Sequence, residues 1–326
     1  MNRPDIRPIK ITDFIGQRKA SEAISQIVGA AQETGQQPRH ILIEGFAGTG
    51  KTTCARIIAG ELGLHLVNTI GASITNIKVM TDILMSIREG DVLFIDEIHG
   101  VGGGSRNGLP TFEVLYTAME DFRLTVTLAN GATRMQLDWQ MPAFTVIGAT
   151  TRLSKVPMPL RRRFPNSLTL DYYQTSDLAT ILKADAGKLG IDASDEAISE
   201  IAKRGRGTPG TAINLLYNVV DFASASGVEV TPETVAEAML VQGVDDCGLN
   251  DKDRDYLNAL FERFKDAPAG VGAIASVLGL QDNIGTVTDV IEPWLLRCGF
   301  IDRTPRGRVL TDAGRKHVVR QDNGTA

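Results

Sequence analysis

GFAGTGKTT at residues 45–53 decides the fold, because it matches the phosphate-binding pattern G-x-x-x-x-G-K-[ST]. Its glycines let the backbone curl so that successive amides point at phosphate oxygens, and the helix expected after it presents the positive end of its dipole to the same anion. Lys51 can reach the β- and γ-phosphates, and the Thr52 hydroxyl can hold Mg²⁺. The alternative, a glycine-rich turn that binds nothing, is disfavoured by the apolar run before the loop and the helical pattern after it.

A second signal lies where the apolar run 91–96 ends in Asp96 and Glu97. Apolar strands that alternate with helices are typical of a parallel sheet covered on both faces, and the carboxyl ends of such strands meet at the edge where the phosphate loop lies. Asp96 is therefore expected to hold Mg²⁺, and Glu97 to polarise the attacking water. An acidic pair that merely ends a strand is the competing interpretation.

Two further groups are candidates for the same chemistry. Thr150 ends the apolar run 144–151 and could hydrogen-bond the γ-phosphate or the water, although a terminal threonine is usually just a strand residue. Arg161, Arg162 and Arg163 follow a proline-punctuated turn and could supply an arginine finger to the nucleotide of a neighbouring subunit. An exposed basic turn is the alternative for these arginines.

Composition limits the class of protein. The chain has 326 residues, enough for two or three domains, and its 43% apolar and 22% charged content is ordinary for a soluble globular protein. Three widely spaced cysteines argue against a disulfide framework or a zinc ribbon and suit a reducing cytoplasm. The N-terminus lacks a secretory signal pattern and no apolar run is long enough for a membrane span, so we expect a cytoplasmic protein without membrane contact.

The charge is unevenly distributed along the chain. The net charge is −5, whereas residues 301–320 carry six basic and two acidic residues, a local charge of +4. Such asymmetry is typical of a local nucleic-acid footprint, and a solvated basic tail is the alternative.

The pattern of elements divides the chain into three parts. Residues 1–170 alternate apolar strands with helices and predict an α/β P-loop domain with a parallel sheet in three layers. Residues 171–245 contain four capped helical patterns, which predict a small helical lid domain. Residues 246–326 predict three helices and a two-stranded wing around the turn at 305–307, the pattern of a winged helix, followed by a flexible C-terminal tail.

Two insertions interrupt the first part. Residues 100–110 are glycine-rich and predict a disordered surface loop. Residues 124–139 alternate apolar and polar residues around Asn130-Gly131, which is a strong signal for a β-hairpin.

Together these motifs resemble those of AAA+ ATPases, and in particular those of the RuvB family. The resemblance rests on segments that run in the family's order over nearly the whole chain. They are RPIKITDFIGQ (7–17), GFAGTGKTT (45–53), GDVLFIDEIH (90–99), AMEDFRL (118–124), FTVIGATTR (144–152), PLRRRF (159–164), RGTP (206–209) and GFIDRTPRGR (299–308).

The resemblance implies a hexameric motor that uses ATP and Mg²⁺ to translocate double-stranded DNA and so drives branch migration of four-way junctions. It assigns adenine contacts to Phe14, Ile15, Gln17, Tyr173 and Pro209, and phosphate contacts to Gly48, Thr49, Gly50, Lys51, Thr52 and Thr53. It makes Asp96 and Glu97 the Walker B pair, with Thr52 and Asp96 on the metal, Thr150 the sensor-1 residue and Arg163 the finger supplied in trans.

The same resemblance assigns two binding surfaces. Arg303, Arg306 and Arg308 of the wing would contact DNA phosphates. The hairpin would dock on a RuvA-like junction-binding partner through Val126, Leu128, Met135 and Leu137.

The chain departs from the family pattern at the lid. RuvB-like proteins usually carry an arginine, the sensor-2 residue, where this chain has Gly210, and a second nearby arginine aligns with Asn214. Loss of a cation from the γ-phosphate weakens hydrolysis more than binding, unless Arg162, Arg204 or Arg206 substitutes. Two alternatives therefore stay open beside the motor: a nucleotide-gated DNA-binding or adaptor protein with weak hydrolysis, and another AAA+ ATPase such as a loader.

Overall fold

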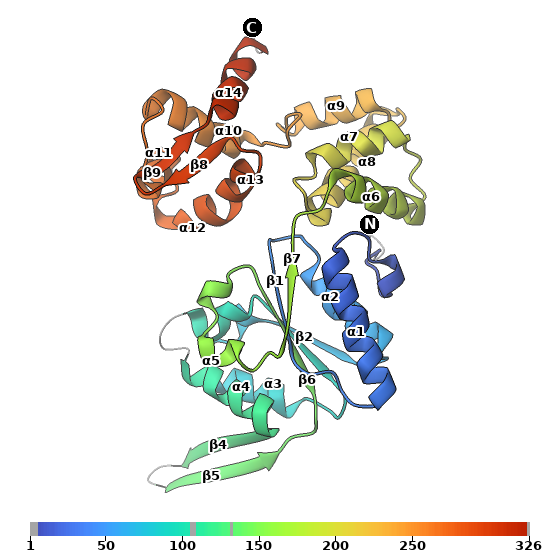
Figure 1. Cartoon of the computed structure of the whole chain (residues 1–326), viewed down its shortest axis with the longest axis vertical. Coiled ribbons are helices and arrows are strands. Elements are labelled where there is room, and N and C mark those ends of the chain that lie inside the picture. Colours follow the sequence, from blue (N-terminus) through green and yellow to red (C-terminus); the bar gives the residue numbers. More distant parts are fainter. Residues whose placement is uncertain (1–5, 105–108, 131–132, 325–326) are drawn as a thin grey trace. The chain divides into compact units, whose positions relative to one another are not determined.

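The computed structural model describes residues 6–104, 109–130 and 133–324, which form two compact units (Figure 1). The first unit comprises the chain up to Gly190 together with Gly207–Thr211. The second comprises Ile191–Arg206 and the chain from Ala212 onward. Among the described residues, every helix is too short or too polar to cross a lipid bilayer.

A five-stranded parallel sheet forms the centre of the first unit, as the apolar runs predicted. Its order is β2 (Leu66–Ile70), β3 (Val92–Asp96), β6 (Thr145–Thr150), β1 (Ile41–Gly45) and β7 (Asn166–Leu170). All neighbouring strands pair in parallel; Ile41, for example, lies opposite Ile147 and Asn166. The phosphate-loop strand β1 and the acidic strand β3 are therefore separated by β6, whose end lies between theirs.

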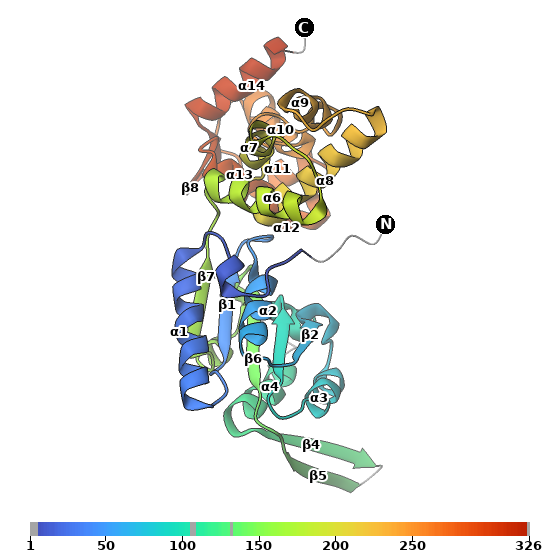
Figure 2. The ribbon, with the colours of Figure 1, turned by 90° about the vertical axis from the view of Figure 1, so that its right-hand side faces the viewer.

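Helices cover both faces of this sheet, which gives the predicted three layers (Figures 1 and 2). On one face lie α1 (Arg18–Thr34) and α2 (Lys51–Glu61), and on the other α3 (Ile77–Met85) and α4 (Leu109–Asp121). Side chains alternate along a strand, so Ile41 and Ile43 pack in the α1–α2 core while Leu42 packs in the α3–α4 core. Both faces are apolar because both are buried.

Two local features of the first unit were not predicted. One is the edge strand β7, although Leu168 and Leu170 alternate inward along it. The other is the short turn η1 (Ile11–Asp13), after which α1 begins only behind Gln17, whose φ is 48°. The left-handed turn at Gly16 and Gln17 ends the incoming segment and redirects it into the helix.

The predicted hairpin is present and projects from the body of this unit (Figure 2). It consists of β4 (Arg123–Asn130) and β5 (Thr133–Gln140), paired from Arg123–Gln140 to Asn130–Thr133. The Gly131 turn and the side chains of 126–137 lie outside the described part, and so do the proposed docking residues Val126, Leu128, Met135 and Leu137. Of the glycine-rich stretch, residues 105–108 are likewise outside it, and its start forms η3 (Ile98–Gly104).

The remaining elements follow the predicted helical lid and winged helix. The other helical pieces of the first unit are η2 (Gly71–Ser73), η5 (Leu153–Lys155), α5 (Met158–Arg161) and α6 (Thr175–Leu189). The lid region continues with α7 (Asp195–Arg204), α8 (Pro209–Ser226) and α9 (Pro232–Val241). The winged helix contains α10 (Asp251–Asn258) with η6 (Ala259–Arg263), α11 (Val271–Val277), η7 (Gln281–Asn283), α12 (Ile284–Thr286) with η8 (Val287–Ile291) and α13 (Glu292–Arg297), and the wing strands β8 (Ile301–Thr304) and β9 (Gly307–Leu310).

The C-terminal segment is not the flexible tail that its charge suggested. It forms α14 (Asp312–Gly324), which begins where the Gly314 N–H donates to the Thr311 hydroxyl at 3.0 Å. Val318 is buried in the core of the winged helix, and Arg315 pairs with Asp266 at 2.8 Å. Lys316 and Arg320 of the same helix are exposed.

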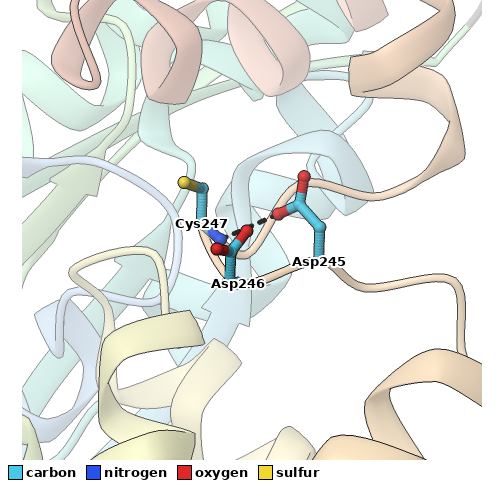
Figure 3. Close-up of side chains that lie close together, drawn as sticks. All are labelled: Asp245, Asp246 and Cys247. Atoms are coloured by element: carbon cyan, nitrogen blue, oxygen red, sulfur yellow. Dashed lines mark hydrogen bonds between the residues drawn. The ribbon is translucent and has the colours of Figure 1, made fainter. Parts of the chain in front are cut away.

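Hydrogen bonds of Asp245 link the connection between α9 and α10 to α14. Its side chain gathers with those of Asp246 and Cys247 (Figure 3). Oδ1 accepts from the backbone N–H groups of Cys247 and Leu249 at 2.9 and 2.8 Å, and Oδ2 lies 3.0 Å from Nε2 of His317. Both oxygens therefore have protein donors, so we interpret this group as a structural joint.

We expect this joint to weaken as the pH rises. Hydrogen bonds to Asp245 and Cys247 raise the pKa of His317 from 6.5 to about 9. A raised pKa means that the protonated ring stabilises the folded state, so its contribution is complete below pH 6.5 and is lost as pH rises through about 9. The loss in unfolding free energy should be on the order of 2–3 kcal/mol.

Urea unfolding followed by Trp294 fluorescence at several pH values would measure this, because the Trp294 indole N–H donates to the Cys247 carbonyl at 3.2 Å. The other tryptophan, Trp139, would be replaced by Phe in all samples. His317→Gln keeps a donor without titrating and should have a flatter profile over this range. The same steep profile in both proteins would contradict the expectation.

Candidate active site and wing

The phosphate loop is fully formed between β1 and α2. Gly48 and Gly50 have φ values of 77° and 103°, which a side chain would disfavour, and they turn the loop so that α2 starts at Lys51. The Lys51 ammonium lies inside the curve and donates to the carbonyls of Gly45 and Phe46, both at 2.9 Å. Burial lowers the pKa of Lys51, and the charges of Glu97 and Asp96 oppose that shift.

The neighbouring threonines complete the loop. Thr49 is buried and its hydroxyl donates to the Phe46 carbonyl at 2.8 Å. Thr52 and Thr53 lie partly exposed in the first turn of α2. The predicted loop residues are thus brought together as the motif required.

A pair of oxygen groups suited to a hard cation lies beside Lys51. The Thr52 hydroxyl donates to the Asp96 carboxylate, which also accepts from the Glu97 N–H at 2.9 Å. Burial raises the pKa of Asp96, while these hydrogen bonds and Lys51 oppose the shift. Thr52 and Asp96 line a cavity of about 760 Å³ that also contains Arg56. A hydroxyl and a carboxylate on an accessible wall fit the ligand preference of Mg²⁺.

Glu97 is held by several donors at one oxygen. Its backbone has a φ of 47°, a left-handed conformation uncommon for a residue with a side chain. Oε2 accepts from the N–H and hydroxyl of Thr151 at 3.2 and 2.9 Å, and Nδ1 of His99 lies 3.1 Å away. Burial alone would raise the pKa of Glu97, but these hydrogen bonds and the charge of Lys51 lower it to about 2. The carboxylate is therefore ionised at neutral pH.

Thr151, and not Thr150, donates hydrogen bonds to Glu97. Thr150 is completely buried, and its hydroxyl contacts Nδ1 of His99 at 2.9 Å and accepts from the Arg152 N–H at 3.0 Å. A direct contact to a phosphate is not available to it in this conformation. Thr151, which is partly exposed and bonded to Glu97, was missed by the sequence reasoning, as was His99. The second threonine of the GATT segment was the available signal for Thr151.

Two aromatic side chains flank the loop at Gly50. A β-carbon at Gly50 would lie 3.6 Å from both the Phe14 ring and the Tyr173 hydroxyl, and that hydroxyl donates to the Thr49 carbonyl at 3.3 Å. Phe14 and Tyr173 are buried, whereas Ile15 is only partly so. These residues are assembled where an adenine is expected.

Gln17 is used differently from the prediction. Its side-chain amide pairs with the backbone of Asp171: Oε1 accepts from the Asp171 N–H at 3.1 Å and Nε2 donates to the Asp171 carbonyl. The amide thus ties the N-terminal segment to the end of β7.

The segment after Arg206 is bonded directly to the phosphate loop. The Gly210 N–H donates to the Gly48 carbonyl at 3.2 Å, one residue after Pro209 opens α8. A β-carbon at Gly210 would lie 3.2 Å from Gly48 Cα, closer than most side-chain contacts. Tyr172 stacks on Phe46 of the loop with ring centroids 4.4 Å apart. This segment therefore contacts the phosphate loop through the backbone of Gly210 and the ring of Tyr172.

The arginines considered as substitutes for the missing sensor are used elsewhere. Arg204 pairs with Glu200 at 2.6 Å, and Arg206 pairs with Asp253 at 3.0 Å, both within the second unit. Arg162 is exposed, and so is Asn214 on α8. The contacts of the described residues therefore give no support for Arg162, Arg204 or Arg206 as a substitute for the sensor-2 arginine.

Arg163 is docked against α4. Its guanidinium pairs with Glu120 at 2.5 Å, donates to the Pro159 carbonyl at 2.9 Å, and lies over the Tyr116 ring at 4.8 Å. Its Nε is buried without a hydrogen-bond partner among the described residues. Arg163 is thus held by Glu120, Pro159 and Tyr116 within its own chain.

In the wing, two of the three predicted DNA contacts have an internal partner. Glu292 is fully buried and pairs with Arg303 at 2.6 Å and with Arg308 at 2.8 Å, while the Tyr256 hydroxyl donates to it at 3.1 Å. Arg306 lies exposed in the turn between β8 and β9 and has no ion pair with a described residue. Two of the basic side chains of the wing, Arg303 and Arg308, therefore neutralise the charge of buried Glu292.

Comparisons with known proteins agree over the whole chain. Family models match for the RuvB P-loop domain at residues 6–170, the RuvB AAA lid domain at 173–245 and the RuvB C-terminal winged-helix domain at 246–319. The Holliday junction branch migration complex subunit RuvB of Thermobifida fusca is 42% identical over 314 residues, 96% of this chain and 87% of the relative. That of Corynebacterium jeikeium is 41% identical over 315 residues, 96% and 86%.

Solved structures agree as well. The Thermotoga maritima RuvB Holliday junction branch migration motor has a TM-score of 0.84 and 37% identity, with 96% of this chain and 98% of that one covered. A mutant of Thermotoga maritima RuvB has a TM-score of 0.86 at 36% identity, with 96% of this chain and 99% of that one covered.

We expect Arg308 and Arg306 to differ in their effect on folding. Arg308→Met removes a bidentate partner from buried Glu292 and should lower the unfolding free energy of the second unit by about 2–3 kcal/mol. Arg306→Met should change it by less than about 0.5 kcal/mol. Urea unfolding monitored at Trp294, with Trp139 replaced by Phe, would measure both. Equal effects would contradict this assignment of the wing arginines.

Proposed function

Since the chain belongs to the RuvB family of AAA+ ATPases, we propose that it translocates duplex DNA by ATP hydrolysis and drives branch migration of four-way junctions. One observation carries the proposal: Lys51, Asp96 and Glu97 converge at the carboxyl edge of the sheet of an ATPase whose chain ends in a winged helix. The comparisons favour this motor over the adaptor and the loader.

Nucleotide binding follows from the loop geometry. The phosphates would occupy the curve of the loop, where Lys51 exchanges two carbonyl partners for phosphate oxygens. Thr52 and Asp96 would hold Mg²⁺, which when bound neutralises charge on the phosphates. Phe14, Ile15, Tyr173 and Pro209 would enclose the adenine.

Hydrolysis would rest on Glu97 and on a neighbouring subunit. Glu97 is ionised and accepts hydrogen bonds, so it can orient a water toward the γ-phosphate. Arg163 would be supplied in trans, exchanging Glu120 for the phosphate of the adjacent subunit in a homo-hexamer. The sensor-1 contact to the γ-phosphate would come from Thr151, or from Thr150 after a local opening of the end of β6.

Partner and DNA binding would use the two projecting elements. We assign residues 1–170 to the ATPase domain, 171–245 to the lid and 246–326 to the DNA-binding winged helix. Arg306 is the wing residue best placed for a DNA phosphate, and the hairpin would dock on a RuvA-like partner. Such a motor would work on chromosomal DNA in the cytoplasm.

Branch migration of a synthetic four-way junction tests the motor. Lys51→Ala and Glu97→Gln should each lower migration and ATP turnover by at least about 100-fold, because Lys51 carries the positive charge that faces the phosphates and Glu97 carries the carboxylate that orients the water. Lys78→Ala and Glu237→Gln, both at exposed positions, are the matched controls and should retain activity. Undiminished migration by both active-site variants would refute the proposal.

DNA affinity measured over a range of salt concentrations tests the wing. Arg306→Ala should weaken binding to every DNA sequence and reduce the slope of log affinity against log salt by about 1. Arg18→Ala, an exposed arginine of α1, is the control. An unchanged slope for Arg306→Ala would mean that this arginine does not contact a phosphate.

A further inference from the structure

His99 lies two residues after Glu97 and links it to the end of β6. Its side chain is only 16% exposed. Nδ1 is 3.1 Å from Glu97 Oε2 and 2.9 Å from the Thr150 hydroxyl oxygen. One ring nitrogen therefore touches the proposed water-orienting carboxylate and the proposed sensor strand at once.

We assign the proton of His99 from the partners of Nδ1, whose nearest oxygens are Glu97 Oε2 at 3.1 Å and the Thr150 hydroxyl at 2.9 Å. A hydroxyl can donate or accept, whereas the carboxylate oxygen, which already accepts from Thr151, can only accept, so Nδ1 carries the proton and shares it between these two oxygens. Oε2 then accepts from His99 and twice from Thr151, whereas Oε1 has no hydrogen bond to a described residue. The carboxylate is thus held by one oxygen, and its other oxygen is left to accept from a water.

We propose that His99 is a positioning residue, which sets the orientation of Glu97 by donating from Nδ1 to Oε2. This rests on the role given to Glu97 under the proposed function. Thr151, directly after β6, approaches Oε2 from one side, and His99 approaches from η3, so together they restrict rotation of the carboxylate about its bond.

Two substitutions of His99 distinguish a role of Nδ1 from a role of Nε2. Asn places its side-chain nitrogen near the position of Nδ1, whereas Gln places it near Nε2. We expect His99→Asn to keep kcat for ATP within about threefold of the wild type. His99→Gln and His99→Ala should lower kcat roughly 10- to 100-fold, as expected for a misplaced reacting group, with KM and the affinity for a fluorescent ATP analogue unchanged.

A double variant tests whether His99 acts through Glu97. Glu97→Gln combined with His99→Ala should be no slower than Glu97→Gln alone. The inference would be overturned by equal kcat values for the Asn and Gln variants. It would also be overturned if the substitutions changed nucleotide affinity rather than kcat, or if the Ala and Gln variants lost nucleotide binding. If Glu97→Gln keeps wild-type turnover, the proposed function of Glu97 fails; if it is inactive while all His99 variants match the wild type, the positioning role alone fails.

Discussion

The hydrogen bonds from the Lys51 ammonium to the carbonyls of Gly45 and Phe46 are the interaction on which the site depends. A buried ammonium needs acceptors, and the loop supplies them only because Gly48 and Gly50 adopt left-handed conformations. The same curvature fixes the start of α2 at Lys51. The negative charges of Asp96 and Glu97 favour the protonated form of Lys51 and so oppose the effect of its burial.

Much of this arrangement could be predicted from the sequence. The parallel sheet, the loop, the acidic strand end and the hairpin follow from apolar runs and turn residues that act locally. The edge strand β7 was missed because its five residues contain only two inward leucines, a signal too short to distinguish from a loop. Helix α14 was missed because its basic residues obscured the helical spacing of its two buried positions, Gly314 and Val318.

The finer features of the site depend on which way single side chains point. Successive residues of a strand face opposite sides, so the end of β6 places Thr150 in the core and Thr151 at Glu97. A charge count also cannot show pairing: Arg303 and Arg308 look like a DNA footprint, yet both contact Glu292, which lies well before them in sequence and is buried. Likewise, the partner of Arg163 on α4 becomes evident only from the packing of α5 against it.

The bond between Gly210 and Gly48 joins two uncharged main-chain groups. Because neither group carries a net charge, salt does not screen this contact as it would screen the attraction between an arginine and an anion. A β-carbon at Gly210 would lie 3.2 Å from Gly48 Cα, so any side chain at this position would crowd the loop.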